Sequence, residues 1–314
     1  MGLMDPVLSH ISALEYWRSV RVGSRSFRAV EDAGALLKEP PKKGTLAEPG
    51  PWWLSRPLHV IVGNSSARRS SSEVVSHVQG SPLPAGSVLD TLNGFCVCSP
   101  ELCFLQMASA LTLPKLIELG FELCGTYDTS NGDIRACMPL TSVDKLVAFV
   151  EHAGSAYGKT AARRALRNIA DGSASPRETI LTMLLCLPYA QGGYGIEMPR
   201  LNYRIELGRR EQRIAGRTYL VGDLYWPAAR LDVEYDGGLH VDAERVSKDS
   251  MRRDALVSMS ITVLTVTSWQ LNDGGEMNGI AHAIAARVGK QLRYKDPKFT
   301  QANRALRKEL LGRS

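Results

Sequence analysis

The sequence contains no long hydrophobic run. Hydrophobic residues make up 44% of the chain, yet no apolar segment approaches the roughly 18 residues that a membrane-spanning helix requires. The opening residues, MGLMDPVLSH, lack the basic stretch followed by an apolar stretch that directs secretion. We therefore expect a cytoplasmic protein with no membrane partner.

Cysteine is scarce and is not arranged in metal-binding pairs. Of the six cysteines, Cys96, Cys98 and Cys103 cluster, but Cys96 and Cys98 are closer together than in the usual zinc knuckle. Cys103 lies on an apolar, helix-like stretch. Buried free thiols in a reducing compartment are therefore favoured over a zinc site.

Acidic residues are few near the C-terminus, although the chain as a whole has a net charge of only +6. In residues 287–314, Asp296 and Glu309 alone oppose a series of bases. The bases are Arg287, Lys290, Arg293, Lys295, Lys298, Arg304, Arg307, Lys308 and Arg313. Such a segment can contact the phosphates of a nucleic acid, and it can equally be the solvated face of a last helix.

Hydrophobic periodicity indicates two α/β halves, 1–155 and 156–314. In the first we expect a helix within 1–25, a strand at 58–62, a helix at 99–118, a strand near 133–139 and a helix at 142–153. In the second we expect helices at about 159–170 and 175–186, strands at 201–207, 217–225 and 230–236, a helix at 243–259, a strand at 261–267 and a helix at 275–290. This order predicts a mixed sheet flanked by helices.

Three acidic residues lie on adjacent predicted strands of the second half. Asp223 is near the end of one strand, and Glu234 and Asp236 share a face of the next because they are two residues apart. Clustered carboxylates are costly unless a cation holds them, and oxygen ligands of this kind suit Mg²⁺ or Mn²⁺. Alternatively, Asp236 with Gly237 forms a turn, and Asp223 caps a helix or pairs with an arginine.

The runs GDLYWPAARLDVEYDGGLH (222–240) and KDSMRRDALVSMSITVLTVT (248–267) resemble the very-short-patch-repair-like endonuclease domain of the PD-(D/E)XK superfamily. The resemblance covers about residues 170–290. The matching positions are Asp223, Glu234, Asp236, Gly237, His240, Asp249 and Arg252. The resemblance implies a restriction-endonuclease-like fold and hydrolysis of DNA, with Asp223 and Glu234 holding Mg²⁺ or Mn²⁺.

One departure from the superfamily pattern affects the mechanism. Asp236 stands where the usual E-x-K motif has a lysine that orients the attacking water. His240 then becomes the candidate general base or phosphate contact. Arg252 is a candidate contact for the phosphate charge, or else part of a structural ion pair with Asp249 or Asp236.

Glu178 has two interpretations. The SPRET segment (175–179) matches the opening helix of the family, which contributes a glutamate to the active site. The same residues form an N-terminal capping box, with Ser175 as the N-cap, Pro176 at the first helical position and Glu178 at the third. Both roles remain open at this point.

Lys159, Arg163 and Arg167 recur along one face of a predicted helix. They are candidates for contact with the DNA backbone, although a solvated helix face gives the same pattern. The first half also has a family resemblance. SHISALEYWR (9–18), LHVIVGNSSARR (58–69) and CSPELCFLQMASAL (98–111) resemble segments of abortive-infection type IV antitoxin-like proteins, which implies DNA binding or transcriptional control.

Two functions follow from these features. The first is a Mg²⁺-dependent DNA endonuclease in phage defence or DNA repair. The second is a non-catalytic, antitoxin-like regulator that binds DNA through a nuclease fold without turnover. Either allows a protein partner or a homodimer. Arginine partners for both Asp223 and Glu234 would count against the first.

Overall fold

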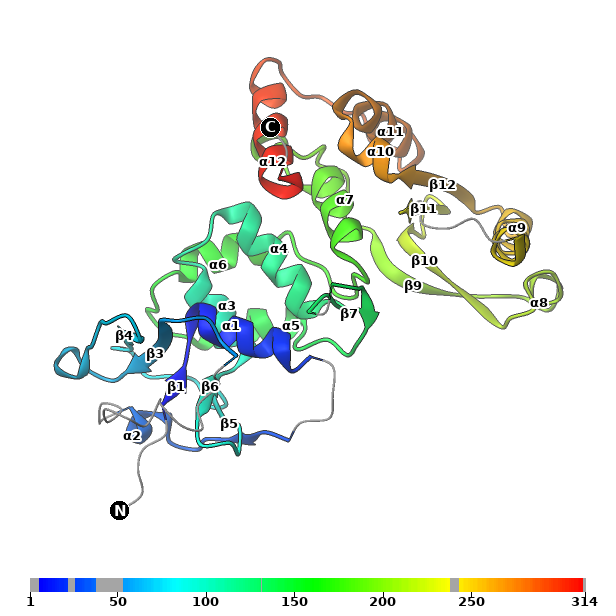
Figure 1. Cartoon of the computed structure of the whole chain (residues 1–314). Coiled ribbons are helices and arrows are strands. Elements are labelled where there is room, and N and C mark those ends of the chain that lie inside the picture. The colour runs from blue at the N-terminus through cyan, green and yellow to red at the C-terminus, as the bar shows by residue number, and fades with distance from the viewer. Residues whose placement is uncertain (1–5, 22–25, 38–52, 131, 238–242, 313–314) are drawn as a thin grey trace. The chain divides into compact units, whose positions relative to one another are not determined.

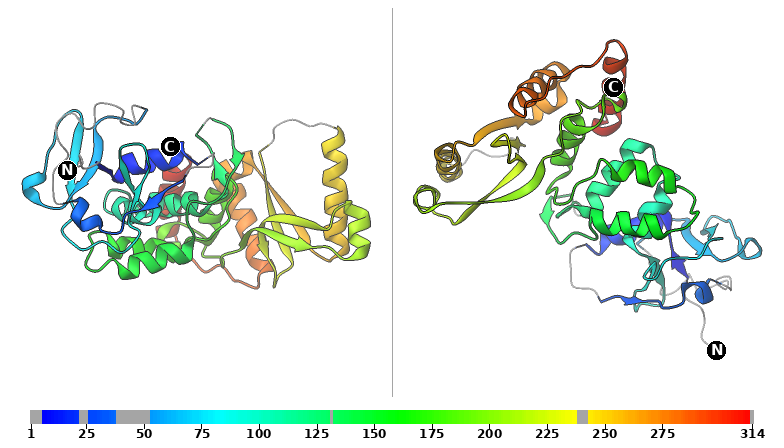
Figure 2. Two further views of the ribbon diagram at one scale, coloured as in Figure 1. Left: turned by 90° about the horizontal axis from the view of Figure 1, so that it is seen from below. Right: turned by 180° about the vertical axis from the view of Figure 1, so that it is seen from behind.

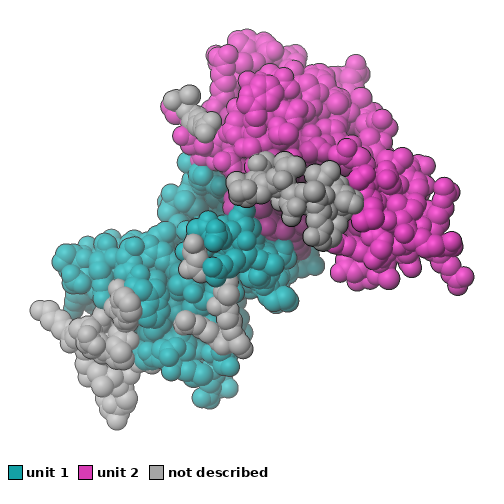
Figure 3. Space-filling model, turned by 45° about the vertical axis from the view of Figure 1, so that its right-hand side comes forward, with its two compact units in different colours: residues 1–169 teal, residues 170–314 magenta. Residues whose placement is uncertain are grey.

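The computed structural model describes residues 6–21, 26–37, 53–130, 132–237 and 243–312 (Figure 1). The chain divides into two compact units, residues 1–169 and 170–314, coloured separately in Figure 3. The division therefore lies at residue 169 and not near 155. The reason is helix α6 (Lys159–Leu166), which buries Ala162, Ala165 and Leu166 and packs against α4 and α5 of the first unit.

Unit 1 is built on a six-stranded mixed sheet in the order β2-β5-β6-β1-β3-β4. Its strands are β1 (Val7–Leu8), β2 (Arg28–Ala29), β3 (Leu58–Val62), β4 (Val74–Val78), β5 (Val88–Asp90) and β6 (Cys96–Cys98). The pairs β1–β6 and β3–β4 are parallel, and the other three pairs are antiparallel. A short hairpin of β7 (Tyr127–Asp128) and β8 (Arg135–Ala136) stands apart from this sheet.

The helices of unit 1 pack on one another and on the sheet (Figure 1). They are α1 (His10–Ser19), α2 (Ala33–Leu36), α3 (Pro100–Met107), α4 (Leu113–Cys124), α5 (Val143–His152) and α6, with a short 3-10 turn η1 (Ser65–Ala67). The helix expected over 99–118 is two helices. The second begins at its own cap, where the Thr112 side chain accepts a hydrogen bond from the backbone N–H of Lys115.

Unit 2 contains a four-stranded mixed sheet in the order β12-β11-β10-β9. Its strands are β9 (Arg200–Glu206), β10 (Tyr219–Trp226), β11 (Leu231–Asp236) and β12 (Thr262–Thr267). The first three form an antiparallel meander, and β12 is parallel to β11. The expected α/β class, with a mixed sheet flanked by helices, is confirmed.

The helices of unit 2 are α7 (Pro176–Cys186), α8 (Arg209–Ala215), α9 (Ala243–Ser258), α10 (Ser268–Asn272), α11 (Gly274–Arg287) and α12 (Lys298–Leu311), with a 3-10 turn η2 (Tyr189–Gln191). Helix α8 connects β9 to β10 and packs against α9 (Figure 2). Buried side chains of β9 and β10 meet Ala255 and Leu256 of α9 in one core cluster. This core fixes α9 against the sheet beside the acidic residues of β10 and β11.

All six cysteines are free thiols, and Cys96, Cys98, Cys103 and Cys124 are buried. Burial raises the pKa of the Cys103 thiol to about 12, so that this thiol is inert at neutral pH. None of the described helices combines the length and the apolar character needed to cross a bilayer.

Candidate active site

The acidic residues lie where β10 and β11 stop pairing through their backbones. The paired register runs from Trp226 opposite Leu231 to Leu224 opposite Val233. Past Leu224 and Val233, a side chain takes the place of the backbone acceptor. Asp223 Oδ2 accepts a hydrogen bond from the Tyr235 N–H at 3.0 Å. Asp223 is therefore held beside the end of β11 that carries Glu234.

Strand β10 is distorted at Asp223. Leu220 and Tyr225 belong to the same core cluster although they are an odd number of residues apart, so the strand changes face between them. On β9, Asn202 lies between the partners of Gly222 and Leu224 and has a φ of 44°, which is uncommon for a residue other than glycine. Backbone outliers of this kind often occur at functional sites.

Asp232 is an active-site candidate that the sequence analysis missed. It lies on β11, its side chain is 0% exposed, and neither of its carboxylate oxygens has a hydrogen-bond partner among the described residues. Asp232, Glu234 and Asp236 follow one another at intervals of two along the strand, so the same alternation that linked Glu234 to Asp236 also indicates Asp232.

Gly222 gives the Asp232 carboxylate its space. A Cβ atom at position 222 would lie 2.6 Å from Asp232 Oδ1 and 2.9 Å from its Cγ. Contacts this short are not tolerated, so a residue with a side chain here would push Asp232 out of its place. The absence of a side chain at position 222 therefore makes room for the acidic cluster.

Arg252 of α9 binds Glu234. Its Nε and Nη2 donate to Glu234 Oε1 at 2.8 and 2.5 Å, and Nη2 also donates to the Val221 carbonyl at 2.6 Å. The same Nη2 lies 3.6 Å from Asp232 Oδ2. Among the described residues, Arg252 therefore forms a structural ion pair, with Glu234 and Asp232 as its partners.

One arginine does not compensate three acids in this space. Burial and the Glu178 carboxylate raise the pKa of Asp223 to about 7. Burial and the Glu234 carboxylate raise the pKa of Asp232 to about 8. Arg252 lowers both values without cancelling the rise. Asp223 and Asp232 therefore hold a proton to a higher pH than ordinary carboxyl groups do.

The Glu178 carboxylate accepts hydrogen bonds at the N-terminus of its own helix, α7. The Glu178 N–H donates to Ser175 Oγ at 3.1 Å, and Ser175 Oγ donates to Glu178 Oε1 at 3.0 Å. Glu178 Oε2 accepts from the Ala174 N–H at 3.0 Å and from Asn202 Nδ2 at 2.8 Å. The capping role is present in the structure, and the Asn202 bond ties this cap to the distorted part of the sheet.

Of the other two predicted catalytic residues, Asp236 and His240, the structure describes only Asp236. Asp236 is exposed at the end of β11. His240 and the Asp249 side chain lie outside the described residues.

The predicted DNA-contacting bases on α6 belong to unit 1, not to the unit that carries the acids. Lys159 Nζ donates to the carbonyls of Glu151 and Gly154, each at 2.9 Å. Arg163 forms an ion pair with Glu151. Arg167 is exposed at the C-terminal cap of the helix. Local contacts therefore account for Lys159 and Arg163.

No three His, Cys, Asp or Glu side chains of the described part of the chain are grouped closely enough to form a ready metal-ligand set. Mg²⁺, however, commonly takes only one or two protein carboxylates and completes its shell with water and phosphate. The Asp232 carboxylate, whose oxygens have no hydrogen-bond partner among the described residues, and the neighbouring Asp223 carboxylate are oxygen donors of this kind. Glu234 is already bound by Arg252.

Comparisons of this chain with protein-family models, with curated proteins and with solved structures find no match.

Proposed function

We propose that unit 2 hydrolyses phosphodiester bonds of DNA with the help of Mg²⁺ or Mn²⁺, held by one or two carboxylates of the cluster formed by Asp223, Asp232 and Glu234. The observation that carries this proposal is the buried acidic cluster, in which a single guanidinium faces three carboxyl groups. A buried carboxylate without partners is costly for folding. Such a cluster is understandable if a cation and a phosphate complete it.

The residues of the chain have separable roles in this proposal. A bound divalent ion neutralises charge on a phosphate and lowers the pKa of a water molecule. Asp223 and Asp232 release protons to hold the ion. Arg252 fixes the position of Glu234 through two hydrogen bonds to one oxygen, which leaves the other oxygen for the ion. His240 and Asp236 remain candidates for accepting the proton of the attacking water.

The chain order of unit 2 supports the same proposal. The elements follow one another as α7, β9, α8, β10, β11, α9 and β12, with β9, β10 and β11 antiparallel and β12 parallel to β11. Apart from α8, this is the order predicted from hydrophobic periodicity, and three positions of the family resemblance, Asp223, Glu234 and Arg252, meet within it. A PD-(D/E)XK-type fold for unit 2 is part of the proposal.

A second candidate function, a DNA-binding regulator without turnover, is favoured by one contact. Glu234 is bound by Arg252, as expected of an acidic site that has become a structural ion pair. Asp223 has no arginine partner among the described residues and accepts only a backbone N–H. Because only one of the two acids is paired, we place the nuclease first.

Cleavage of supercoiled plasmid in Mg²⁺ or Mn²⁺ tests the proposal. Asp223→Asn and Asp232→Asn should each lower the nicking rate at least about 100-fold, since each removes a carboxylate that would bind the ion. Asp254→Asn is the matched control, because Asp254 is an exposed acid on the same helix as Arg252. No cleavage by the wild type, together with retained DNA binding, would favour the regulator.

A further inference from the structure

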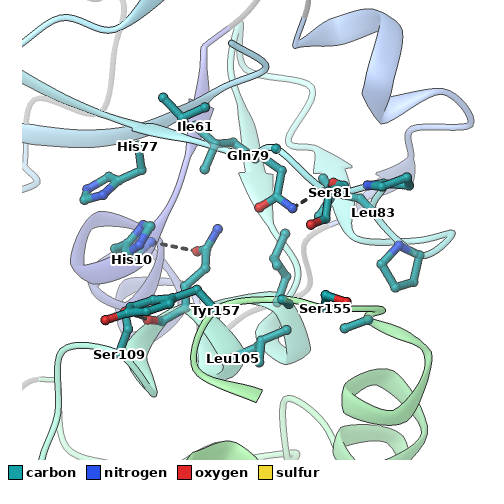
Figure 4. Close-up of a pocket in the computed structure, with 18 of the residues that line it drawn as sticks. His10, Ile61, His77, Gln79, Ser81, Leu83, Leu105, Ser109, Ser155 and Tyr157 are labelled. Atoms are coloured by element: carbon teal, nitrogen blue, oxygen red, sulfur yellow. Dashed lines mark hydrogen bonds between the residues drawn. The ribbon is translucent and has the colours of Figure 1, made fainter. Parts of the chain in front are cut away.

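Unit 1 contains a cavity of about 520 Å³ that is independent of the acidic cluster. It lies among the start of α1, strand β4 with the segment that follows it, and helices α3 and α5 (Figure 4). Its volume is within the roughly 300–1,000 Å³ range of sites that bind small molecules. The figure shows His10, His77 and Tyr157 together on one side and Leu83 on another.

Three histidines adjoin on one side of this cavity. The rings of His10 and His77 are stacked with centroids 3.7 Å apart. Behind them, His59 Nδ1 and His77 Nε2 are joined by a hydrogen bond of 2.9 Å. His10 Nδ1 is bonded to Ser9 Oγ at 3.1 Å. The second ring nitrogens, Nε2 of His10 and Nδ1 of His77, have no hydrogen-bond partner among the described residues.

The bond between His59 and His77 determines what the cavity side of His77 offers. When His59 Nδ1 donates, neutral His77 carries its proton on Nδ1 and is a donor at its second nitrogen. When His77 is protonated, it donates from both nitrogens and His59 accepts. In both of these states Nδ1 of His77 carries a proton and is a hydrogen-bond donor. A ligand that offers hydrogen-bond acceptors to this nitrogen therefore stabilises these two states.

The charges around the cavity favour an anion. No aspartate or glutamate is among the residues that line it, whereas Arg68 is, and this arginine has no ion-pair partner within the described ranges. Ser76 also lines the cavity, and its hydroxyl is buried without a hydrogen-bond partner in the described structure. A buried hydroxyl of this kind is costly unless a ligand or water completes its bonding.

The backbone at His10 is a further sign of a constructed site. Its φ is 49°, a left-handed conformation that is unfavourable for a residue other than glycine. Gln106 of α3 holds this residue in place by accepting the His10 N–H at 3.0 Å. The structure thus maintains a strained backbone that stacks one imidazole on another at the cavity wall.

We propose that this cavity binds a small organic oxyanion. Its charged group would lie against the imidazoles of His10 and His77 and against Arg68. Its apolar body would lie against the aliphatic and aromatic lining. This lining includes Leu83, Leu102, Leu105 and Phe149.

Binding is coupled to protons. Burial and the neighbouring imidazoles lower the pKa of His10 to about 3, and burial, His59 and Arg68 lower the pKa of His77 to about 4. Burial also lowers the pKa of His59, while Glu15 opposes that change. An oxyanion beside the rings stabilises their charged forms, so the complex takes up protons and its affinity rises as pH falls.

Calorimetry on the full chain tests this proposal with benzenesulfonate and phenyl phosphate as probes and benzyl alcohol as the neutral comparison. Benzenesulfonate keeps its charge between pH 5.5 and 7.5, so its pH dependence reports on the protein. We expect binding of at least one anion at least about tenfold tighter than that of benzyl alcohol. We also expect benzenesulfonate to bind more tightly at pH 5.5 than at 7.5, and proton uptake in two buffers of different ionisation enthalpy.

Variants locate the site. Arg68→Gln changes an exposed side chain and should weaken anion binding about tenfold. Its neighbour Arg69→Gln is the matched control, because Arg69 is exposed and does not line the cavity. His77→Gln, checked for folding by its thermal transition, should lower the number of protons taken up on binding. Equal binding of the alcohol and the anions, binding of none of them, or equal loss in the two arginine variants would overturn the proposal.

Discussion

Asp232 has a carboxylate that is fully buried, faces a single guanidinium at 3.6 Å and has no hydrogen-bond partner among the described residues. Its raised pKa means that the folded chain holds a proton that the unfolded chain releases near pH 4. In the cation-free protein, the contribution of Asp232 to the free energy of unfolding of unit 2 therefore falls as pH rises from about 4 towards about 8. Asp223 adds to this fall up to about pH 7.

This linkage predicts a stabilising substitution. In EDTA at pH 8, Asp232→Asn should be more stable than the wild type by about 1–3 kcal/mol, because the amide removes a buried charge. At pH 5 the two proteins should differ little. Urea unfolding at both pH values measures the difference, with Asp254→Asn expected to keep the wild-type slope. An Asp232→Asn variant that gains no stability over the wild type between pH 5 and pH 8 would contradict the protonation that we assign to Asp232.

Gly222 is a second test at the residue scale. Gly222→Ala should destabilise unit 2 by about 1–3 kcal/mol, because its Cβ would lie 2.6 Å from Asp232 Oδ1. Gly279→Ala is the control: nothing lies within 4 Å of its added Cβ, and it sits in helix α11. That change should stabilise by about 0.5–1 kcal/mol. Thermal unfolding measures the change in stability of each variant. Equal changes would show that Asp232 moves away from the added Cβ at position 222 without cost.

At the scale of helices and strands, the sequence predicted the elements that have regular periodicity. The strands of unit 2 and helices α7, α9 and α11 lie within a few residues of their expected positions. Helices α8 and α12 were not predicted, because their apolar positions are few among many charged residues. Alternation also failed at β10, where the distortion at Asp223 places Leu220 and Tyr225 on one face.

The sequence predicted two acidic residues of the candidate site but not their partners. Asp223 and Glu234 were found from their strands, and the structure brings them together. The choice of Arg252 as a partner of Glu234 depends on how α9 packs against the sheet, which no local pattern encodes. The role of Glu178 was undecided because the same residues form a cap and match a family motif.

The cap of α7 provides a prediction at this scale. Ser175→Ala should destabilise unit 2 by about 1 kcal/mol, because the Glu178 N–H loses its acceptor. Plasmid nicking per folded molecule should be retained, since Ser175 makes no contact with the acidic cluster among its described hydrogen bonds. Ser142→Ala, which removes the equivalent cap of α5 in unit 1, is the matched control. Loss of nicking without loss of stability would instead assign Ser175 and Glu178 to the active site.

At the scale of the whole molecule, each unit has its own core and its own candidate site. We therefore expect two thermal transitions. Leu116→Ala and Leu256→Ala each change a buried position. The first should lower the free energy of unfolding of unit 1, and the second that of unit 2, by about 2–5 kcal/mol. The transition that moves to lower temperature in each variant therefore belongs to that unit. Mn²⁺ should then raise only the unit 2 transition, and benzenesulfonate only that of unit 1. A single transition shifted by both ligands would contradict independent sites.

Calorimetry of Mn²⁺ binding at pH 7 tests whether the acidic cluster of unit 2 is a divalent-cation site. We expect one ion per chain, bound with release of protons because Asp223 and Asp232 hold protons in part in its absence. Asp254→Asn should bind like the wild type. A wild type that binds no more Mn²⁺ than the double variant Asp223→Asn/Asp232→Asn, or that releases no proton, would contradict a cation site at this cluster.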